Sequence, residues 1–275
     1  MPFGIIIDTV GTWVVDIKEN ATVGTDSAAL DLLLEKMWRG LGRDFREYKR
    51  GTIVRRLERR LLATGARTYR DYLQFLETHS AEYQQLADYL TITVSSFFRS
   101  AYTFQQVARL VLPRLMGDKR ARRQGGLSFW SAACARGEEP YSLAIVLADF
   151  LADRLDHFPV SIYATDVSQP ALHQAQAGVY AASELAGLPA SMREKYFTRH
   201  GGGYTVNQNI RRMVHFSYFD LVSTKAPFSH VDGIFCCRVL IYLQRQLQER
   251  VLEMLYHSLA VPGYLQVDDV RGERR

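Results

Sequence analysis

The sequence has 275 residues, 47% of them hydrophobic and 23% charged, with a formal net charge of +5 at pH 7. These proportions are typical of soluble globular chains, so they exclude wholesale disorder, a collagen-like repeat and a coiled coil. No run of about 18 apolar residues is present, which argues against a membrane-spanning helix, and three cysteines cannot build a disulfide framework, which favours a cytoplasmic location.

Residues 1–26 begin with an apolar stretch at 1–17 that is interrupted by Asp8, Gly11 and Asp16. This stretch has no basic start, so it is a poor match to a secretory signal. We expect an extension of unknown role, either a docking segment or an extra hairpin. Residues 27–95 carry apolar residues at spacings of three and four, which predicts a small all-α domain of three or four short helices.

Positive charge is concentrated in that helical region. Residues 35–70 hold twelve Lys or Arg and four acids, a net charge of +8, so the rest of the chain is slightly acidic. Four arginines one helical turn apart in pairs predict a cationic ridge: Arg55, Arg56, Arg59 and Arg60. A solvated surface helix and a nucleic-acid surface are the alternatives, and the second is disfavoured because no aromatic residues are interleaved.

Beyond the helical region, residues 113–126 are expected to form a mobile connector. From residue 127 short apolar runs alternate with helical stretches, which predicts a parallel α/β sheet with crossover helices and a ligand at the carboxyl ends of its strands. The predicted strands lie at 127–132, 160–166, 214–219, 231–236 and 263–269, and the helices at 139–153, 169–177 and 244–259. This domain is expected to span 96–275, with a small β insert at about 187–214 marked by the glycines of a hairpin turn.

The turn that follows the first of these strands is rich in small residues and leads into a helix at residues 131–142. Such a turn lets a ligand approach backbone N–H groups at the helix start. Glu138 and Glu139 would repel a pyrophosphate and favour a ligand with an ammonium, a sulfonium or hydroxyl groups. The alternative is a tight turn whose acids only stabilise the helix dipole.

Asp166 ends the second strand, twenty-nine residues after Gly137. A nucleotide-binding α/β fold places an acid that binds ribose hydroxyls at this position. A helix cap is the alternative, and the small-residue turn beside it favours the ribose interpretation.

Seven short segments occur together in one order, at 91–99, 130–142, 164–166, 175–180, 220–221, 239–242 and 262–264. On these segments the chain resembles the CheR-type chemoreceptor methyltransferases. The resemblance implies a Rossmann-like S-adenosylmethionine methyltransferase domain with a small β insert, preceded by a small all-α domain. It also implies methylation of glutamate side chains on chemoreceptors, with S-adenosylhomocysteine as the second product.

The resemblance implies a role for each matching position. Glu138 would face the amino-acid end of the cofactor, and Asp166 would bind its ribose. Arg99 and Tyr242 would steady the reacting groups, and no metal is implied. The full set of implied cofactor contacts is Ser95, Arg99, Ala132, Glu138, Asp166, Asp220, Leu221 and Arg238.

The resemblance further implies that the basic helix lies along the acidic cytoplasmic helical bundle of a receptor. The insert near Arg199–Tyr204 is short, which favours recognition that is independent of a C-terminal pentapeptide tether. No nucleic-acid partner and no membrane insertion are expected.

The chain departs from the family pattern at two motifs. Cys237 and Arg238 stand where Arg and Asn are usual, and Ala133 stands where a glycine is usual. A methyl group at a close backbone approach weakens binding. A catalytically weak or inactive scaffold or sensor is therefore the alternative function.

Overall fold

The computed structural model describes residues 5–8, 27–122, 125–223 and 225–268. Contacts divide the chain into two compact units. The described part of the first unit comprises residues 5–8, 93–122, 125–223, 225–238 and 251–268. That of the second comprises residues 27–92 and 239–250.

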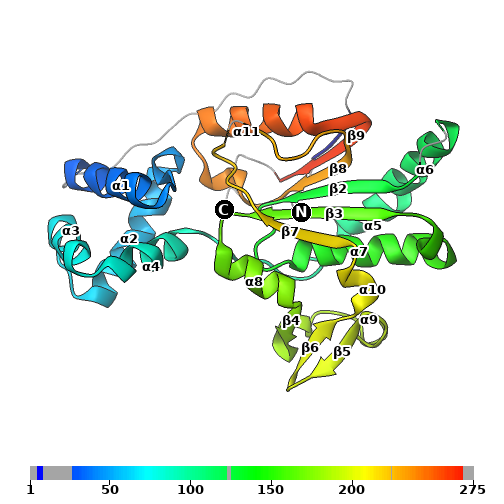
Figure 1. Ribbon diagram of the computed structural model, residues 1–275, viewed down its shortest axis with the longest axis horizontal. Coiled ribbons are helices and arrows are strands. Elements are labelled where there is room, and N and C mark those ends of the chain that lie inside the picture. Colours follow the sequence, from blue (N-terminus) through cyan, green and yellow to red (C-terminus); the bar gives the residue numbers. More distant parts are fainter. Residues whose placement is uncertain (1–4, 9–26, 123–124, 224, 269–275) are drawn as a thin grey trace. The chain divides into compact units, whose positions relative to one another are not determined.

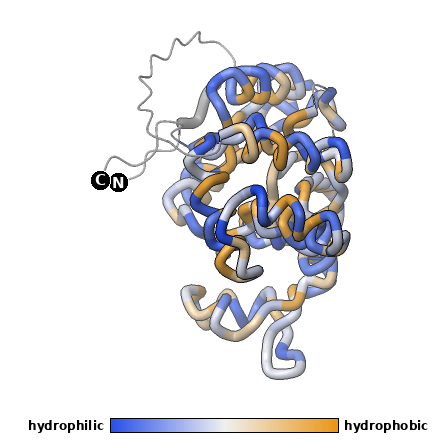
Figure 2. Tube along the Cα trace, turned by 90° about the vertical axis from the view of Figure 1, so that its left-hand side faces the viewer, coloured by the Kyte–Doolittle hydropathy of each residue, from blue (hydrophilic) through white to orange (hydrophobic). Residues whose placement is uncertain are grey.

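The second unit is built from four helices whose apolar residues face one another. Leu33, Leu57 and Leu86, from three different helices, are completely buried, and Figure 2 shows hydrophobic and hydrophilic residues alternating along the helical tubes. A capping box between Thr68 and Asp71 starts one helix, and Gly65 ends the preceding one in the left-handed conformation. The helical elements are α1 (Ser27–Leu41), η1 (Phe45–Glu47), α2 (Arg50–Thr64), α3 (Tyr69–Thr78), α4 (Ser80–Leu90) and η5 (Leu240–Tyr242).

The first unit is organised around a six-stranded sheet of order β1-β9-β8-β2-β3-β7, parallel except for the antiparallel β1–β9 pair. Helix α7 covers one face and α11 lies on the other (Figure 1). The strands are β1 (Ile5–Asp8), β2 (Leu127–Ala132), β3 (Val160–Asp166), β7 (Val214–Tyr218), β8 (Val231–Cys236) and β9 (Leu259–Val267). The helical elements are α5 (Ala101–Gln106), the π-helical turn η2 (Val107–Val111), α6 (Leu112–Ala121), α7 (Glu138–Leu151), η3 (Ala152–His157), α8 (Gln169–Ala177) and α11 (Arg245–Ser258).

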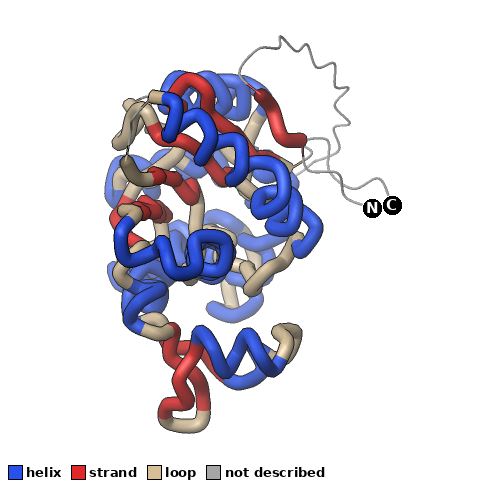
Figure 3. The backbone as a smooth tube through the Cα atoms, turned by 90° about the vertical axis from the view of Figure 1, so that its right-hand side faces the viewer, coloured by secondary structure: helices blue, strands red, loops and turns tan. Residues whose placement is uncertain are grey.

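A second, three-stranded antiparallel sheet of order β4-β6-β5 follows α8, and its strands are drawn in red below the main sheet in Figure 3. Gly201 and Gly202 have φ of 52° and 86° and form the hairpin turn between its last two strands. The elements are β4 (Val179–Ala181), η4 (Ala182–Leu185), α9 (Ala190–Tyr196), β5 (Phe197–His200), β6 (Gly203–Val206) and α10 (Gln208–Arg211).

The predicted fold class is confirmed: a small all-α part precedes a Rossmann-like domain with a small antiparallel sheet. Helix α8 has the predicted bounds, and β2, β3 and β8 begin and end where expected. The expected connector at 113–126 is wrong over its first part, because α6 continues to Ala121 with Leu115 buried and Lys119 paired with Asp232. Its residues 123–124 lie outside the described residues. Of the extension at 1–26, only β1 is described, as an edge strand.

Candidate functional site

The turn between β2 and α7 is held in an unusual backbone conformation. Ala133, Ala135 and Gly137 all have positive φ, at 63°, 50° and 92°. A Cβ at Gly137 would lie 2.9 Å from the Cβ of Ala175 and 3.1 Å from the hydroxyl of Tyr180, so this position requires glycine. Alanine tolerates the left-handed region only at a cost of about 1 kcal/mol. The turn is therefore maintained by the contacts around it.

Asp166 provides the strongest of these contacts. Its Oδ2 accepts a hydrogen bond from the backbone N–H of Ala135 at 2.8 Å, and its Oδ1 accepts one from Ser168 at 2.8 Å. Its carbonyl also accepts the N–H of Phe219 at 3.1 Å. Asp166 thus ties the turn to the carboxyl ends of β3 and β7, and the proposed ribose contact would have to use its remaining acceptor capacity.

Glu138 opens α7 and is almost completely buried, with 1% exposure. Its Oε1 accepts a hydrogen bond from Nη2 of Arg136 at 2.9 Å, whereas Oε2 has no partner. Among the described residues, it is the one buried side-chain nitrogen or oxygen without a hydrogen bond. Burial raises the pKa of this carboxyl, and Arg136 acts in the opposite direction. An unsatisfied buried carboxylate oxygen costs several kcal/mol, so this atom is suited to a cationic or hydrogen-bond-donating ligand.

A second acidic cluster lies beside the turn, and the sequence did not predict that Glu139 and Arg238 lie together with Asp268. Oε1 of Glu139 accepts a hydrogen bond from Ser131 at 2.7 Å, and burial raises its pKa to about 7. Asp268 and Arg238 act on the same carboxyl in opposite directions, and Nε of Arg238 lies 3.7 Å from Oδ2 of Asp268. Burial also raises the pKa of the Cys237 thiol, which argues against a nucleophilic cysteine.

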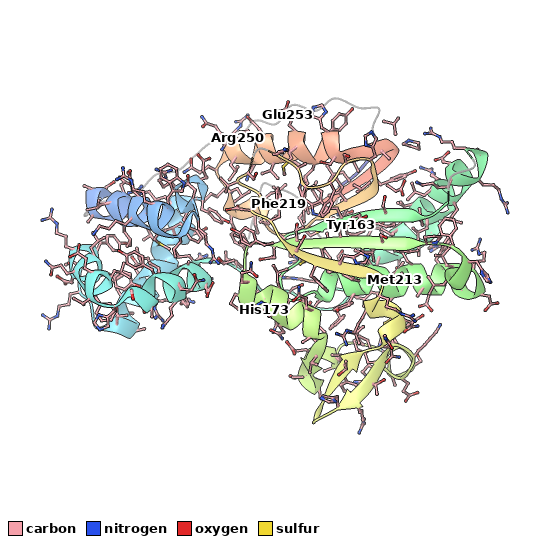
Figure 4. All side chains as sticks on the ribbon, in the orientation of Figure 1. Tyr163, His173, Met213, Phe219, Arg250 and Glu253 are labelled. Atoms are coloured by element: carbon pink, nitrogen blue, oxygen red, sulfur yellow. The ribbon has the colours of Figure 1, made fainter. Side chains whose placement is uncertain are left out.

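Asp220 and Leu221 follow β7 at the same edge of the sheet. Oδ1 of Asp220 accepts the N–H of Val222 at 2.9 Å, and Leu221 is buried. The preceding residue, Phe219, packs edge-on against Trp130 with ring centroids 5.8 Å apart, and Figure 4 shows it beside the ends of the parallel strands. Ala132, Glu138, Asp166 and Asp220 are thus all held around this one sheet edge.

Ser95 and Arg99 lie in the segment that enters the first unit. The N–H of Phe98 donates to the Ser142 hydroxyl at 2.9 Å, and that hydroxyl donates to the carbonyl of Glu138 at 2.6 Å. The exposed Arg99 donates from Nη1 to the carbonyl of Val94 at 2.9 Å. Its charge lowers the pKa of Asp268, which burial otherwise raises, so Arg99 is near the acidic cluster. Ser95 is half-buried in the same segment.

Tyr242 belongs to the other unit. It ends η5, and its carbonyl accepts the N–H of Lys49 at 2.8 Å. A place for Tyr242 beside Arg99 stays a prediction.

The expected cationic ridge is reduced to two arginines. Nε of Arg56 donates to the carbonyl of Tyr89 at 2.8 Å, and Arg60 forms an ion pair with Glu82 at 2.5 Å. Arg55 and Arg59 are exposed on α2, and within the described residues neither makes an ion pair.

No described helix has the length and apolar character needed to cross a bilayer. The described residues also contain no group of three His, Cys, Asp or Glu side chains arranged to hold a metal ion.

Comparison with known families identifies both parts of the chain. The family "CheR methyltransferase, all-alpha domain" matches residues 28–91, and "CheR methyltransferase, SAM binding domain" matches residues 93–269. These matches confirm the resemblance in the sequence.

Individual relatives agree with the family match. A chemotaxis protein methyltransferase of Salmonella typhimurium is 35% identical over 80% of this chain and 75% of its own length. One from Borreliella burgdorferi is 28% identical over 94% of this chain and 93% of its own length. An uncharacterized 104.1 kDa protein of Rhodobacter capsulatus is 35% identical over 81% of this chain, which spans only 23% of that protein.

The residues at the sheet edge fit S-adenosylmethionine. The unpartnered Oε2 of Glu138 suits an ammonium group, and the acids beside the turn suit a positively charged ligand better than a phosphate.

Proposed function

Because this chain belongs to the CheR methyltransferase family, we propose that it transfers a methyl group from S-adenosylmethionine to glutamate side chains of chemoreceptors. The observation that carries the proposal is the buried, unpartnered carboxylate oxygen of Glu138 at the start of α7. It lies inside the segment that matches the SAM-binding domain of the family.

The cofactor would be held by residues from five segments of the first unit. Glu138 would accept a hydrogen bond from its ammonium group, and Asp166 would bind its ribose hydroxyls. Asp220 and Leu221 would lie near its adenine. The remaining proposed contacts are Ser95, Arg99, Ala132 and Arg238.

The chain has little proton transfer to perform. When bound, S-adenosylmethionine supplies an electrophilic methyl group and is released as S-adenosylhomocysteine. A receptor glutamate is ionised at pH 7, so it is itself the nucleophile and needs no general base. Arg99 and Tyr242 would position this carboxylate and exclude water, which makes placement the main source of rate enhancement.

The partner surface would be the exposed face of α2. Arg55 and Arg59 would attract the acidic helical bundle of a cytoplasmic receptor, and this attraction would weaken with salt. Arg56 and Arg60 would contribute less because their guanidinium groups already bind Tyr89 and Glu82. Recognition would not depend on a C-terminal pentapeptide tether.

One experiment tests the cofactor and the reaction in sequence. Calorimetry with S-adenosylhomocysteine is expected to show binding, and purified receptor incubated with labelled S-adenosylmethionine is expected to gain base-labile methyl ester. No binding would remove the proposal. Binding without ester formation would favour the scaffold or sensor alternative.

The departures at Cys237 and Arg238 have their own test. The double variant Cys237→Arg/Arg238→Asn restores the usual family residues. Higher activity in this variant than in the natural protein would identify these positions as the cause of a weak activity. An unchanged activity would show that the cluster of Glu139, Arg238 and Asp268 tolerates them.

A further inference from the structure

Arg136 lies in the turn between β2 and α7, two residues before Glu138, and it forms two ion pairs. Its Nη2 lies 2.9 Å from Oε1 of Glu138, and its Nη1 lies 2.6 Å from Oε1 of Glu184. The two carboxylates come from different parts of the first unit, since Glu138 starts α7 and Glu184 lies in η4, beside the small sheet.

The backbone of Arg136 is fixed as well as its side chain. The hydroxyl of Tyr180, in β4, donates to the Arg136 carbonyl at 2.6 Å. Oε2 of Glu184 accepts the N–H of Ala181 at 2.8 Å, which fixes the second carboxylate. The guanidinium is therefore held from two sides, and it has little freedom to leave Glu138.

This arrangement determines which oxygen of Glu138 is available. Arg136 occupies Oε1, and Oε2 is left buried and without a partner. We propose that Arg136 is a positioning residue that orients Glu138 toward the ammonium group of the cofactor, and that Glu184 anchors Arg136 in this role. The proposal rests on the proposed function and concerns only the amino-acid end of the cofactor.

The charges of the three groups agree with a cationic ligand. Two carboxylates and one guanidinium leave a net charge of −1, and the unpartnered oxygen carries part of it. Without Glu184 the cluster would be neutral, and its attraction for an ammonium group would fall. Without Arg136 its net charge would be −2, so a loss of affinity in an Arg136 variant reports lost positioning of Glu138 and not lost attraction. Glu184 therefore has an electrostatic role in addition to holding Arg136.

The same geometry controls the protonation of Glu138. Burial raises the pKa of this carboxyl, Arg136 lowers it and Glu184 raises it. Tyr180 and Cys134 also border Glu138, but burial raises the pKa of both, so they remain neutral near pH 7. Removal of Arg136 should raise the pKa of Glu138 further, and the carboxylate needed by an ammonium group would be lost at a higher pH.

The test uses two ligands that differ only at the amino-acid end. S-adenosylhomocysteine carries the ammonium and carboxylate groups, and 5′-methylthioadenosine lacks them. For Arg136→Met we expect the Kd of S-adenosylhomocysteine to rise about 10-fold at pH 8 and by a larger factor at pH 6. The Kd of 5′-methylthioadenosine should stay within about twofold of the natural protein at both pH values.

Two further variants keep the test decisive. Glu184→Gln leaves the sequence of the turn between β2 and α7 unaltered. It should weaken the binding of S-adenosylhomocysteine about threefold without affecting the binding of 5′-methylthioadenosine. Arg212→Met, an exposed arginine beyond α10, is the matched control and should change neither Kd.

The outcomes separate this inference from the function on which it rests. Equal losses for both ligands, or no loss for S-adenosylhomocysteine in either Arg136→Met or Glu184→Gln, would overturn the role of Arg136 while leaving the proposed function intact. If the natural protein bound neither ligand, the proposed function would fall, and this inference with it.

Discussion

Each unit of the molecule contains a buried glutamate paired with an arginine, and the two pairs differ in how completely they are satisfied. In the helical unit, Glu82 accepts hydrogen bonds from Arg60 on both oxygens, each at 2.5 Å, and a third from Tyr72 at 2.6 Å. In the sheet unit, Glu138 has one oxygen bound to Arg136 and one unpartnered.

The pKa values follow this difference. Burial acts to raise the pKa of Glu82, but the hydrogen bonds from Arg60 and Tyr72 outweigh it, and the pKa lies below its usual value. Burial dominates at Glu138, whose pKa lies above its usual value. A fully bonded buried carboxylate stabilises the fold, whereas an incompletely bonded one is available to a ligand.

The largest expected effect is on the stability of the helical unit. Arg60→Met would leave Glu82 buried without its cation, which typically costs about 3–5 kcal/mol. We expect a loss of about 3 kcal/mol in the free energy of unfolding, measured by urea denaturation. Arg59→Met, on the exposed face of the same helix, is the control and should change the stability by less than about 0.5 kcal/mol. Equal stabilities of the two variants would contradict the assigned role of Glu82.

Glu138 is expected to behave in the opposite way to Glu82, contributing to ligand binding and not to stability. Glu138→Gln removes a buried charge that is only half satisfied, so the stability should be unchanged or increase. The variant loses a charged hydrogen bond worth about 2 kcal/mol, so the Kd of S-adenosylhomocysteine measured by calorimetry should rise about 30-fold. Unchanged affinity combined with a lower melting temperature would assign Glu138 to the fold instead of the ligand.

The pH dependence of stability sharpens the comparison further. The pKa of Glu139 is about 7 in the folded protein, above the usual carboxyl value, so the native state retains a proton that the unfolded chain has lost. Stability should therefore fall as pH rises from about 4.5 to about 7, by about 3 kcal/mol, since each pKa unit corresponds to about 1.4 kcal/mol. Denaturation of Glu139→Gln across this range should show a flatter profile.

The pH dependence of stability that arises from Glu82 has the opposite sign. Its pKa is lowered in the folded protein, so its contribution is present above the pKa of the unfolded chain and is lost as pH falls through the folded pKa. A Glu139→Gln profile identical to that of the natural protein would remove Glu139 as the source of the neutral-pH slope.

The smallest expected effect concerns the exposed arginines of the helical unit. Arg55→Glu/Arg59→Glu should slow receptor methylation about 10-fold at low salt, with the difference shrinking as salt rises. Binding of S-adenosylhomocysteine should not change. Arg212→Glu provides a charge reversal of the same kind in the other unit. An equal slowing in that control would indicate a general charge effect and no specific docking surface on α2.

Local patterns were enough to predict the sheet unit. The alternation of apolar runs and amphipathic stretches located β2, β3 and β8, and the ends of β2 and β3 placed the small-residue turn beside Asp166, which accepts the N–H of Ala135. Such inferences succeed because parallel strands with crossover helices bring their carboxyl ends to one edge.

Side-chain pairs that form only through tertiary packing could not be predicted from the sequence. Arg136 and Glu184 are 48 residues apart and lie in different elements, so no spacing rule connects them. The ridge of four arginines assumed that all of α2's charges face solvent, but Glu82 and Tyr89 lie close enough to bind two of them. The neighbours of Glu139 could not be predicted because its thiol and carboxyl partners, Cys237 and Asp268, follow the ends of β8 and β9.

The Ser142 hydroxyl, which accepts the Phe98 N–H and donates to the Glu138 carbonyl, links the incoming segment to the first turn of α7. One small polar group thereby couples the strip of backbone that carries Arg99 to the turn that carries Glu138. A displacement of the segment that carries Arg99 would therefore reach the first turn of α7, where Glu138 lies.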